Sequence, residues 1–202
     1  TPICSELSGR KDPLPLVLPG DTLDAWRKRA AGWRKVSDQI LGSLSDAAPV
    51  QLRHEPLGTI YRTDKYTMRR YRYSLTDEEW GYAWLLMPTH RRFTDAAVLA
   101  LHQTTVAGKG EAVGLDITPE ASPGLFYAIE LAERGHVVLA PDAIAFGERQ
   151  ADHRNAKYRS ADEFFAAQPH GSVMAKMAFD PSRALDFLQK LSETSARRVA
   201  CI

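Results

Sequence analysis

Three short apolar runs, separated by helix-like stretches, constrain the fold of this chain most. The runs are "AAVLALH" (96–102), "HVVLAPD" (136–142) and "RRVACI" (197–202). Each has the length and composition of a strand buried on both faces. An alternation of strand, helix, strand, helix and strand requires right-handed crossovers and a parallel sheet with helices on both faces. The sequence therefore predicts an α/β fold.

The helix between the first two runs has recognisable ends. Ser122 is the expected N-cap, Pro123 suits the first helical position, and Gly135 suits the C-terminal cap. The sequence therefore predicts a helix over about 123–134.

A second helical stretch follows a polar loop, because apolar residues recur at helical spacing from Met174 to Leu191. Pro181 lies inside this stretch and is expected either to kink the helix or to begin its second half behind Asp180 as cap.

The N-terminal region, residues 1–56, is expected to be a separate part made of an arm and one helix. Four prolines and Gly20 predict an extended arm over residues 1–20. Residues 22–44 repeat apolar side chains every three or four positions behind the cap-like Asp21, which predicts an amphipathic helix. Its other face is basic, which fits a solvated face or an anion-binding patch; the residues are Arg27, Lys28, Arg29, Arg34 and Lys35.

Residues 57–202 are expected to form the main domain. Its first part, 59–87, is rich in Tyr, Thr, Trp and Met with polar residues between them, which predicts two or three antiparallel strands. The predicted fold is thus a mostly parallel sheet with helices on both faces and an N-terminal antiparallel portion.

Composition excludes several classes of function. The 26 basic and 25 acidic residues give a net charge of +1, so we expect neither a nucleic-acid nor an anionic-membrane partner. No apolar run approaches the roughly 20 residues of a membrane span. Cys4 and Cys201 lie at opposite ends of the chain, and the histidines lack ligand spacing, so neither a disulfide framework nor a metal is expected. No cofactor is predicted, and the sequence leaves open a cytoplasmic or a secreted location.

In open α/β sheets the chemistry gathers beyond the carboxyl ends of the strands. Here those segments are 102–116 and 141–155. Glycines 108, 110 and 114 suggest a phosphate loop, but they do not open a helix directly after a strand, as a dinucleotide site requires. Glycine there fits better a loop that folds back tightly across the strand ends.

Three segments resemble the α/β-hydrolase superfamily, in its bacterial branch similar to dienelactone hydrolases and acetyl xylan esterases. They are "LALHQTT..GK.E..GL" (99–115), "YAIELAERGHVVLAPD...FGER" (127–149) and "DPSRALDFL" before "RRVACI". The resemblance spans roughly 57–202 and is strongest over 96–149.

This resemblance implies hydrolysis of a small-molecule or carbohydrate ester by a Ser-His-Asp/Glu triad, with no cofactor. The nucleophile of such enzymes lies in G-x-S-x-G directly after the strand that matches 198–202, and this motif does not occur in the chain. We therefore expect the chain to be the N-terminal part of a hydrolase. The fold would then be incomplete at its C-terminal end, with the triad beyond Ile202 on the same or an associated polypeptide.

The resemblance also implies that this part supplies one side of an oxyanion hole. The family's His-Gly-X pattern falls on His102, Gln103 and Thr104. The amide of Thr104 is the first candidate donor to the oxyanion and that of Gln103 the second. His102 is expected to shape this loop through hydrogen bonds to the backbone, the alternative being a catalytic base.

Other residues are weaker candidates for substrate contact. Asp142 ends a predicted buried strand, where it could line the pocket or accept backbone amides. Glu148 and Arg149 are expected to form a local ion pair, with substrate contact as the alternative. Cys201 is expected to be inert packing in a buried strand.

Two classes of function remain open from the sequence. One is an esterase completed by residues beyond Ile202. The other is a non-catalytic binding or scaffold domain with a hydrolase-like half-fold, which would leave the strand 198–202 as a bare apolar edge.

Overall fold

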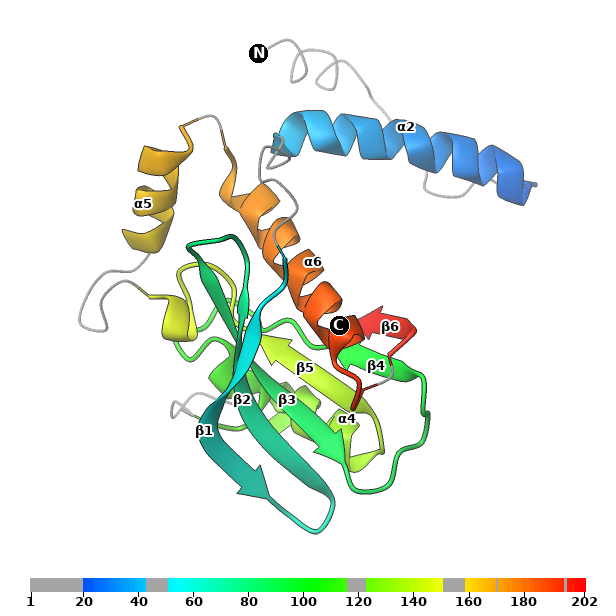
Figure 1. The fold of residues 1–202 in the computed structure, drawn as a ribbon. Coiled ribbons are helices and arrows are strands. Elements are labelled where there is room, and N and C mark those ends of the chain that lie inside the picture. The colour runs from blue at the N-terminus through cyan, green and yellow to red at the C-terminus, as the bar shows by residue number, and fades with distance from the viewer. Residues whose placement is uncertain (1–19, 43–50, 116–122, 151–158, 170, 195) are drawn as a thin grey trace.

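A mixed six-stranded sheet organises the residues that the structure describes. The computed structural model describes residues 20–42, 51–115, 123–150, 159–169, 171–194 and 196–202. The strand order is β1-β2-β3-β5-β4-β6 (Figure 1). The strands are β1 (His54–Arg62), β2 (Tyr66–Ser74), β3 (Trp80–Pro88), β4 (Ala96–Leu99), β5 (Val137–Pro141) and β6 (Arg198–Cys201).

The first three strands form an antiparallel meander, which confirms the strands predicted over 59–87. β2 pairs with β3 along its whole length, from Tyr66 opposite Pro88 to Ser74 opposite Trp80. β1 pairs with β2 and contains an irregularity between Leu57 and Ile60. β3 then pairs antiparallel with β5, which joins the meander to the rest of the sheet.

The parallel part of the sheet consists of β5, β4 and β6, with β4 in the centre. All five residues of β5 are buried, as the unbroken apolar run predicts. The order β5-β4-β6 places the strand that comes first in the chain between the two later ones. The chain passes from β4 to β5 on one side and then crosses over to β6 on the other side of β4. Because β4 and β5 are parallel, the segments that follow them lie at the same end of the sheet.

Helices cover both faces of this sheet, which confirms the predicted α/β class. Helix α6 (Val173–Lys190) packs on one face through Ala184, Phe187 and Leu188, all fully buried. The Phe187 ring stacks on Tyr73 with 5.2 Å between the ring centroids. The short helices α3 (Lys109–Ala112) and α4 (Tyr127–Glu133) pack on the other face.

Helix α6 is continuous through Pro181. The Ser172 side chain caps it by accepting a hydrogen bond from the Ala175 N–H at 3.1 Å. The expectation that Asp180 caps a second half is wrong, since Asp180 is buried inside the helix and forms ion pairs with Arg149 and Lys176.

The helix predicted over 123–134 begins later than expected. Pro123–Leu125 form a 3-10 turn, and the α-helix starts at Tyr127 with Phe126 at the N-cap. The expected cap Ser122 lies outside the described residues. Gly135 ends the helix as predicted, with a φ of 91° that side chains rarely adopt.

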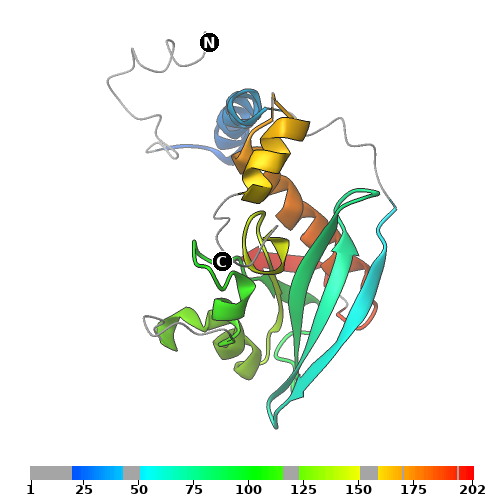
Figure 2. The same cartoon turned by 90° about the vertical axis from the view of Figure 1, so that its left-hand side faces the viewer.

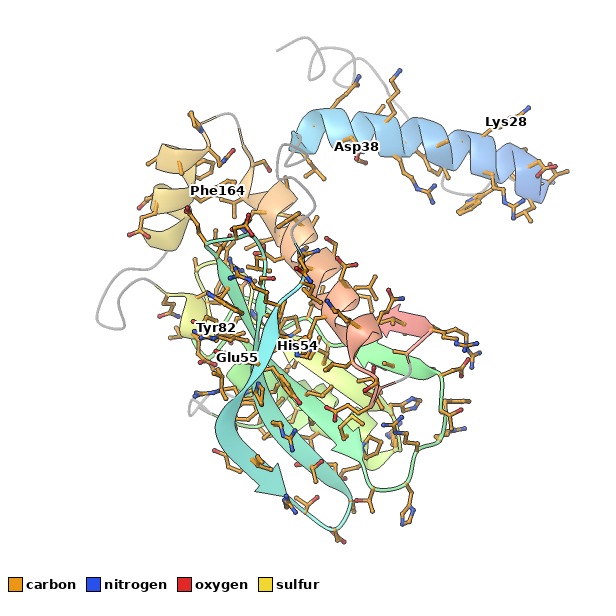
Figure 3. The ribbon with its side chains drawn as sticks, viewed as in Figure 1. Lys28, Asp38, His54, Glu55, Tyr82 and Phe164 are labelled. Atoms are coloured by element: carbon orange, nitrogen blue, oxygen red, sulfur yellow. The ribbon has the colours of Figure 1, made fainter. Side chains whose placement is uncertain are left out.

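The predicted N-terminal helix is present as α2 (Leu23–Leu41), but its cap and burial differ from expectation. Thr22, and not Asp21, caps it by accepting from the Ala25 N–H, whereas Asp21 pairs with Arg29. Within α2 only Ala30 is buried, so the apolar face meets no described core. In Figure 3, Lys28 projects away from the sheet. The predicted arm lies almost entirely outside the described residues.

A further helix, α5 (Arg159–Ala167), occupies what the sequence pattern predicted as loop. In Figures 1 and 2, α5 and α2 both lie beyond the same end of the sheet.

β6 is parallel to β4, as predicted, but it is not buried. It forms the edge of the described sheet, and Arg198, Ala200 and Cys201 are exposed. The expectation that Cys201 is buried packing is therefore wrong. Its apolar sequence matches a strand covered on both faces, but the described residues leave β6 at the edge of the sheet with little covering its side chains.

Gly135 offers a test of this packing. An added Cβ would lie 2.9 Å from the His90 carbonyl oxygen, at a positive φ. We expect Gly135→Ala to lower the free energy of unfolding by roughly 1–3 kcal/mol, as measured by urea denaturation. Gly58→Ala is the matched control, because no atom lies within 4 Å of its added Cβ, and its effect should stay within about 0.5 kcal/mol. Equal effects of the two variants would contradict this packing.

Candidate active site

The loop after β4 presents the backbone N–H groups of Gln103 and Thr104 at the surface of the described structure. Among the residues that the structure describes, no acceptor bonds the amides of Gln103 and Thr104, and both residues are exposed. The next amide, that of Thr105, donates back to the Gln103 carbonyl at 2.8 Å. Unpaired amides that project from one turn are available to an anion or a developing oxyanion.

His102 fixes the start of this loop. Its Nε2 accepts a hydrogen bond from the Ala143 N–H at 3.0 Å, and its Nδ1 lies 2.6 Å from the Gln103 carbonyl oxygen. Because Nε2 is an acceptor, the proton of the neutral ring is on Nδ1, where it is donated to that carbonyl. Both ring nitrogens are thus engaged by backbone, which is the predicted loop-shaping arrangement and not that of a free base.

Asp142 fixes the far end of the same loop. Its Oδ1 accepts the Lys109 N–H at 2.9 Å, and its Oδ2 accepts the Glu148 N–H at 3.0 Å and bonds the Lys109 ammonium. The Asp142 side chain is 0% exposed and that of Lys109 4%. The backbone amide of Asp142 in turn donates to the Tyr82 carbonyl of β3, a residue labelled in Figure 3. The predicted acceptance of backbone amides by Asp142 is what the structure contains.

Two glycines let the backbone approach the Asp142 carboxylate. Gly108 and Gly147 have φ of 54° and 52°. A Cβ on Gly108 would lie 2.5 Å from Asp142 Oδ1, and one on Gly147 would overlap the same carboxylate. These glycines therefore serve a buried side-chain carboxylate.

Glu148 and Arg149 do not pair with each other in the described contacts, so the predicted local ion pair is wrong. Glu148 pairs with Lys109 at 2.6 Å and with Arg70 of β2 at 3.4 Å. Arg149 points to the other side of the segment, toward Glu79 and Asp180. Neighbours in a 3-10 turn point in different directions, which separates the two side chains.

Arg149 belongs to a four-membered ion cluster with Glu79, Lys176 and Asp180. Arg149 and Lys176 each bond both carboxylates, and Lys176 lies 2.8 Å from Asp180. Burial alone would lower the pKa of Arg149, but Asp180 and Glu79 outweigh it and leave the pKa raised. The cluster ties the 142–150 segment to the β2–β3 turn and to α6.

A cavity of about 170 Å³ lies where these segments meet. Its walls are Leu101 to Thr104 after β4, Pro141, Asp142, Ala143 and Phe146 after β5, and Met177 and Pro181 of α6. The structure thus brings the predicted residues His102, Gln103, Thr104 and Asp142 to one cavity, whereas Glu148 and Arg149 are not among its walls.

The sequence analysis missed several charged residues that support this site. Lys109 was interpreted only as part of a glycine-rich loop, and Arg70, Glu79, Lys176 and Asp180 received no role in the site. The only available signal was the flanking of Lys109 by Gly108 and Gly110, which does not reveal a partner 33 residues away.

Neither a metal centre nor a membrane span is found in the described parts of the chain. They contain no group of three or more His, Cys, Asp or Glu side chains placed to hold a metal ion. Likewise, no helix among them is both long and apolar enough to cross a bilayer.

The fold matches solved structures of esterases. A protein from Bacteroides fragilis, assigned as an acetyl xylan esterase, superimposes with a TM-score of 0.73 at 14% identity, over 98% of this chain and 51% of that chain. An acetyl xylan esterase from Paenibacillus sp. R4 matches with 0.51 at 17% identity, over 98% and 55%. A CE15 esterase from a marine bacterial metagenome matches with 0.54 at 14% identity, over 97% and 58%.

These likenesses define the fold as that of α/β-hydrolases, as the sequence resemblance implied. The chain spans about half the length of the solved structures that it matches. No protein-family model and no curated relative matches the sequence.

Tyr73, next to the ion cluster, gives a stability prediction. It is fully buried, and its hydroxyl has no hydrogen-bond partner among the described residues. Burial, with the nearby Asp180 charge, raises the pKa of Tyr73 far above its usual value of 10.0. The unfolded chain therefore ionises first, and stability is kept below about pH 10 and lost as the pH rises further.

We expect Tyr73→Phe to keep or raise the free energy of unfolding by about 1 kcal/mol at pH 7 and to weaken its loss above pH 10. Denaturant titrations at pH 7 to 11 measure both effects. Tyr61→Phe, which removes the hydroxyl of an exposed tyrosine, is the control and should change the free energy of unfolding at pH 7 by less than about 0.5 kcal/mol. A loss of more than 1 kcal/mol at pH 7 would mean that the hydroxyl has a stabilising partner.

Proposed function

We propose that this chain forms the oxyanion side of a carboxylic-ester hydrolase of the acetyl-esterase kind. Its substrate is a small-molecule or carbohydrate ester. The Ser-His-Asp/Glu triad is supplied by residues beyond Ile202, on the same or an associated polypeptide. Glu148 and Arg149, first considered for substrate contact, act in this proposal by holding the 142–150 segment.

The observation that carries this proposal is that Gln103 and Thr104 line the cavity with amides that meet no acceptor among the described residues. They follow β4, at the sheet edge where open α/β sheets place their chemistry. At one end of their loop the His102 ring accepts from the Ala143 N–H, and at the other end the Lys109 N–H donates to Asp142. Both ends are thus bound to consecutive residues that follow β5. Such preorganisation is what an oxyanion donor needs, because the enzyme then pays no reorganisation cost during the reaction.

In the proposed mechanism, the serine attacks the ester carbonyl while the histidine accepts its proton. The carbonyl oxygen becomes negatively charged and receives hydrogen bonds from the Thr104 amide and, second, from the Gln103 amide. The alcohol leaves with the proton from the histidine. Water, activated by the same histidine, then hydrolyses the acyl-enzyme.

The proposal is tested on the protein encoded by the whole gene. It should react with a fluorophosphonate probe and hydrolyse p-nitrophenyl acetate. Failure of both reactions with the folded protein would overturn the hydrolase proposal and favour the non-catalytic binding domain.

Thr104 gives the sharper prediction. Thr104→Pro removes the backbone N–H, and kcat for p-nitrophenyl acetate should fall about 10²–10³-fold. Thr104→Ala is the matched control, since it removes the side chain and keeps the N–H, and its kcat should stay within about threefold. Circular dichroism checks that both variants fold. If the alanine variant loses as much activity as the proline variant, the donor is not this amide.

A further inference from the structure

We propose that Lys109 and Asp142 are a positioning pair that sets the place of the Gln103 and Thr104 amides. The inference deepens the proposed function and rests on it. Neither side chain reaches the reacting atoms in this proposal. Their effect passes through the backbone of the 102–109 loop.

Both ends of the 102–109 loop are bound to consecutive residues, Asp142 and Ala143. The His102 ring accepts from the Ala143 N–H, and the Lys109 N–H donates to Asp142. Between these points lie the amides of Gln103 and Thr104, which meet no acceptor among the described residues. The loop therefore closes on the end of β5, and a shift of Asp142 moves the end of the loop directly.

The carboxylate of Asp142 accepts hydrogen bonds from three donors. It collects the backbone N–H of Lys109 from one loop, the backbone N–H of Glu148 from the other, and the Lys109 ammonium. An asparagine amide could accept only one of these backbone bonds without turning its NH₂ toward another donor. The negative charge is thus required for the full set of contacts.

The buried Lys109–Asp142 ion pair carries a desolvation cost. Burying an ion pair removes two charges from water, and the cost of this desolvation often equals or exceeds the attraction between them. Stability alone is thus a weak reason for a Lys109 ammonium with 4% exposure beside a carboxylate with none. A fixed position for the two loops is the gain that this arrangement provides.

The pair is also connected to strand β2 of the sheet. The Lys109 ammonium also bonds Glu148 at 2.6 Å, and Glu148 reaches Arg70 of β2. Two positive-φ glycines, Gly108 and Gly147, enclose the carboxylate so closely that a Cβ at either position would collide with it. The pair therefore fixes the position of the loop relative to the sheet.

The chain offers a matched control for this pair. Asp180 is also an aspartate buried to within 2% exposure, and it also bonds a lysine, Lys176. It differs from Asp142 in that its described partners are side chains and none belongs to the 102–109 loop. Asp142→Asn and Asp180→Asn thus make the same chemical change at a similar depth.

The experiment compares these two variants in the whole-gene protein. For Asp142→Asn we expect kcat for p-nitrophenyl acetate to fall about 10- to 100-fold with KM within about threefold, because a displaced donor weakens transition-state binding. Amide hydrogen exchange of a 102–110 peptide should be at least about tenfold faster. Asp180→Asn should leave that exchange unchanged, even where it lowers the melting temperature as much, because none of its described partners belongs to the 102–109 loop.

Three results would overturn the inference. One is an equal acceleration of the 102–110 exchange in both variants at equal loss of stability, which would indicate a structural role. Another is unchanged kcat and exchange in Asp142→Asn. If Asp142→Asn does not fold, Lys109→Met is used instead, because it keeps both backbone hydrogen bonds to Asp142. Retention of kcat within about threefold in Lys109→Met would be the third contradicting result.

Hydrogen exchange separates this inference from the proposed function. If the unmodified protein hydrolyses no ester, the proposed function fails and the catalytic meaning of the pair fails with it. The exchange of the 102–110 peptide still shows in that case whether the pair holds the loop.

Discussion

The buried carboxylate of Asp142 is the interaction on which the site depends. A charge with no exposure to water must find several donors within the protein, and here they come from two loops that follow different strands. Satisfying that charge brings the loop after β4 and the segment after β5 together. Residues of both segments line the cavity, Gln103 and Thr104 among them.

The strand order of the sheet places these two segments close together. Parallel β4 and β5 lie side by side, so their carboxyl ends open at the same edge. The cluster of Glu79, Arg149, Lys176 and Asp180 then joins that edge to α6, which contributes the remaining cavity wall. Two groups of charges thus have different tasks. One shapes the loop with the free amides, and the other holds the opposite wall.

The match to esterase structures and the contacts of the site support each other at different levels. At 14–17% identity the superposition defines a fold, and folds of this kind host many reactions. The contacts of the loop itself add chemistry to that fold. The amides of Gln103 and Thr104 meet no acceptor among the described residues, and both ring nitrogens of His102 bind backbone. In the proposed function the two amides stabilise the oxyanion, and His102 orients their loop.

The sequence by itself determined the strands, the helix near Gly135 and the loop that would carry the site, because apolar runs, caps and turns act over a few neighbouring residues. It could not determine which charged side chains form ion pairs. Lys109 and Asp142 are 33 residues apart, and Arg149 and Glu79 are 70 apart, so no local pattern records either contact. The exposure of β6 and the wrong pairing expected for Glu148 and Arg149 have the same origin. Burial and ion pairing are decided only when distant segments pack.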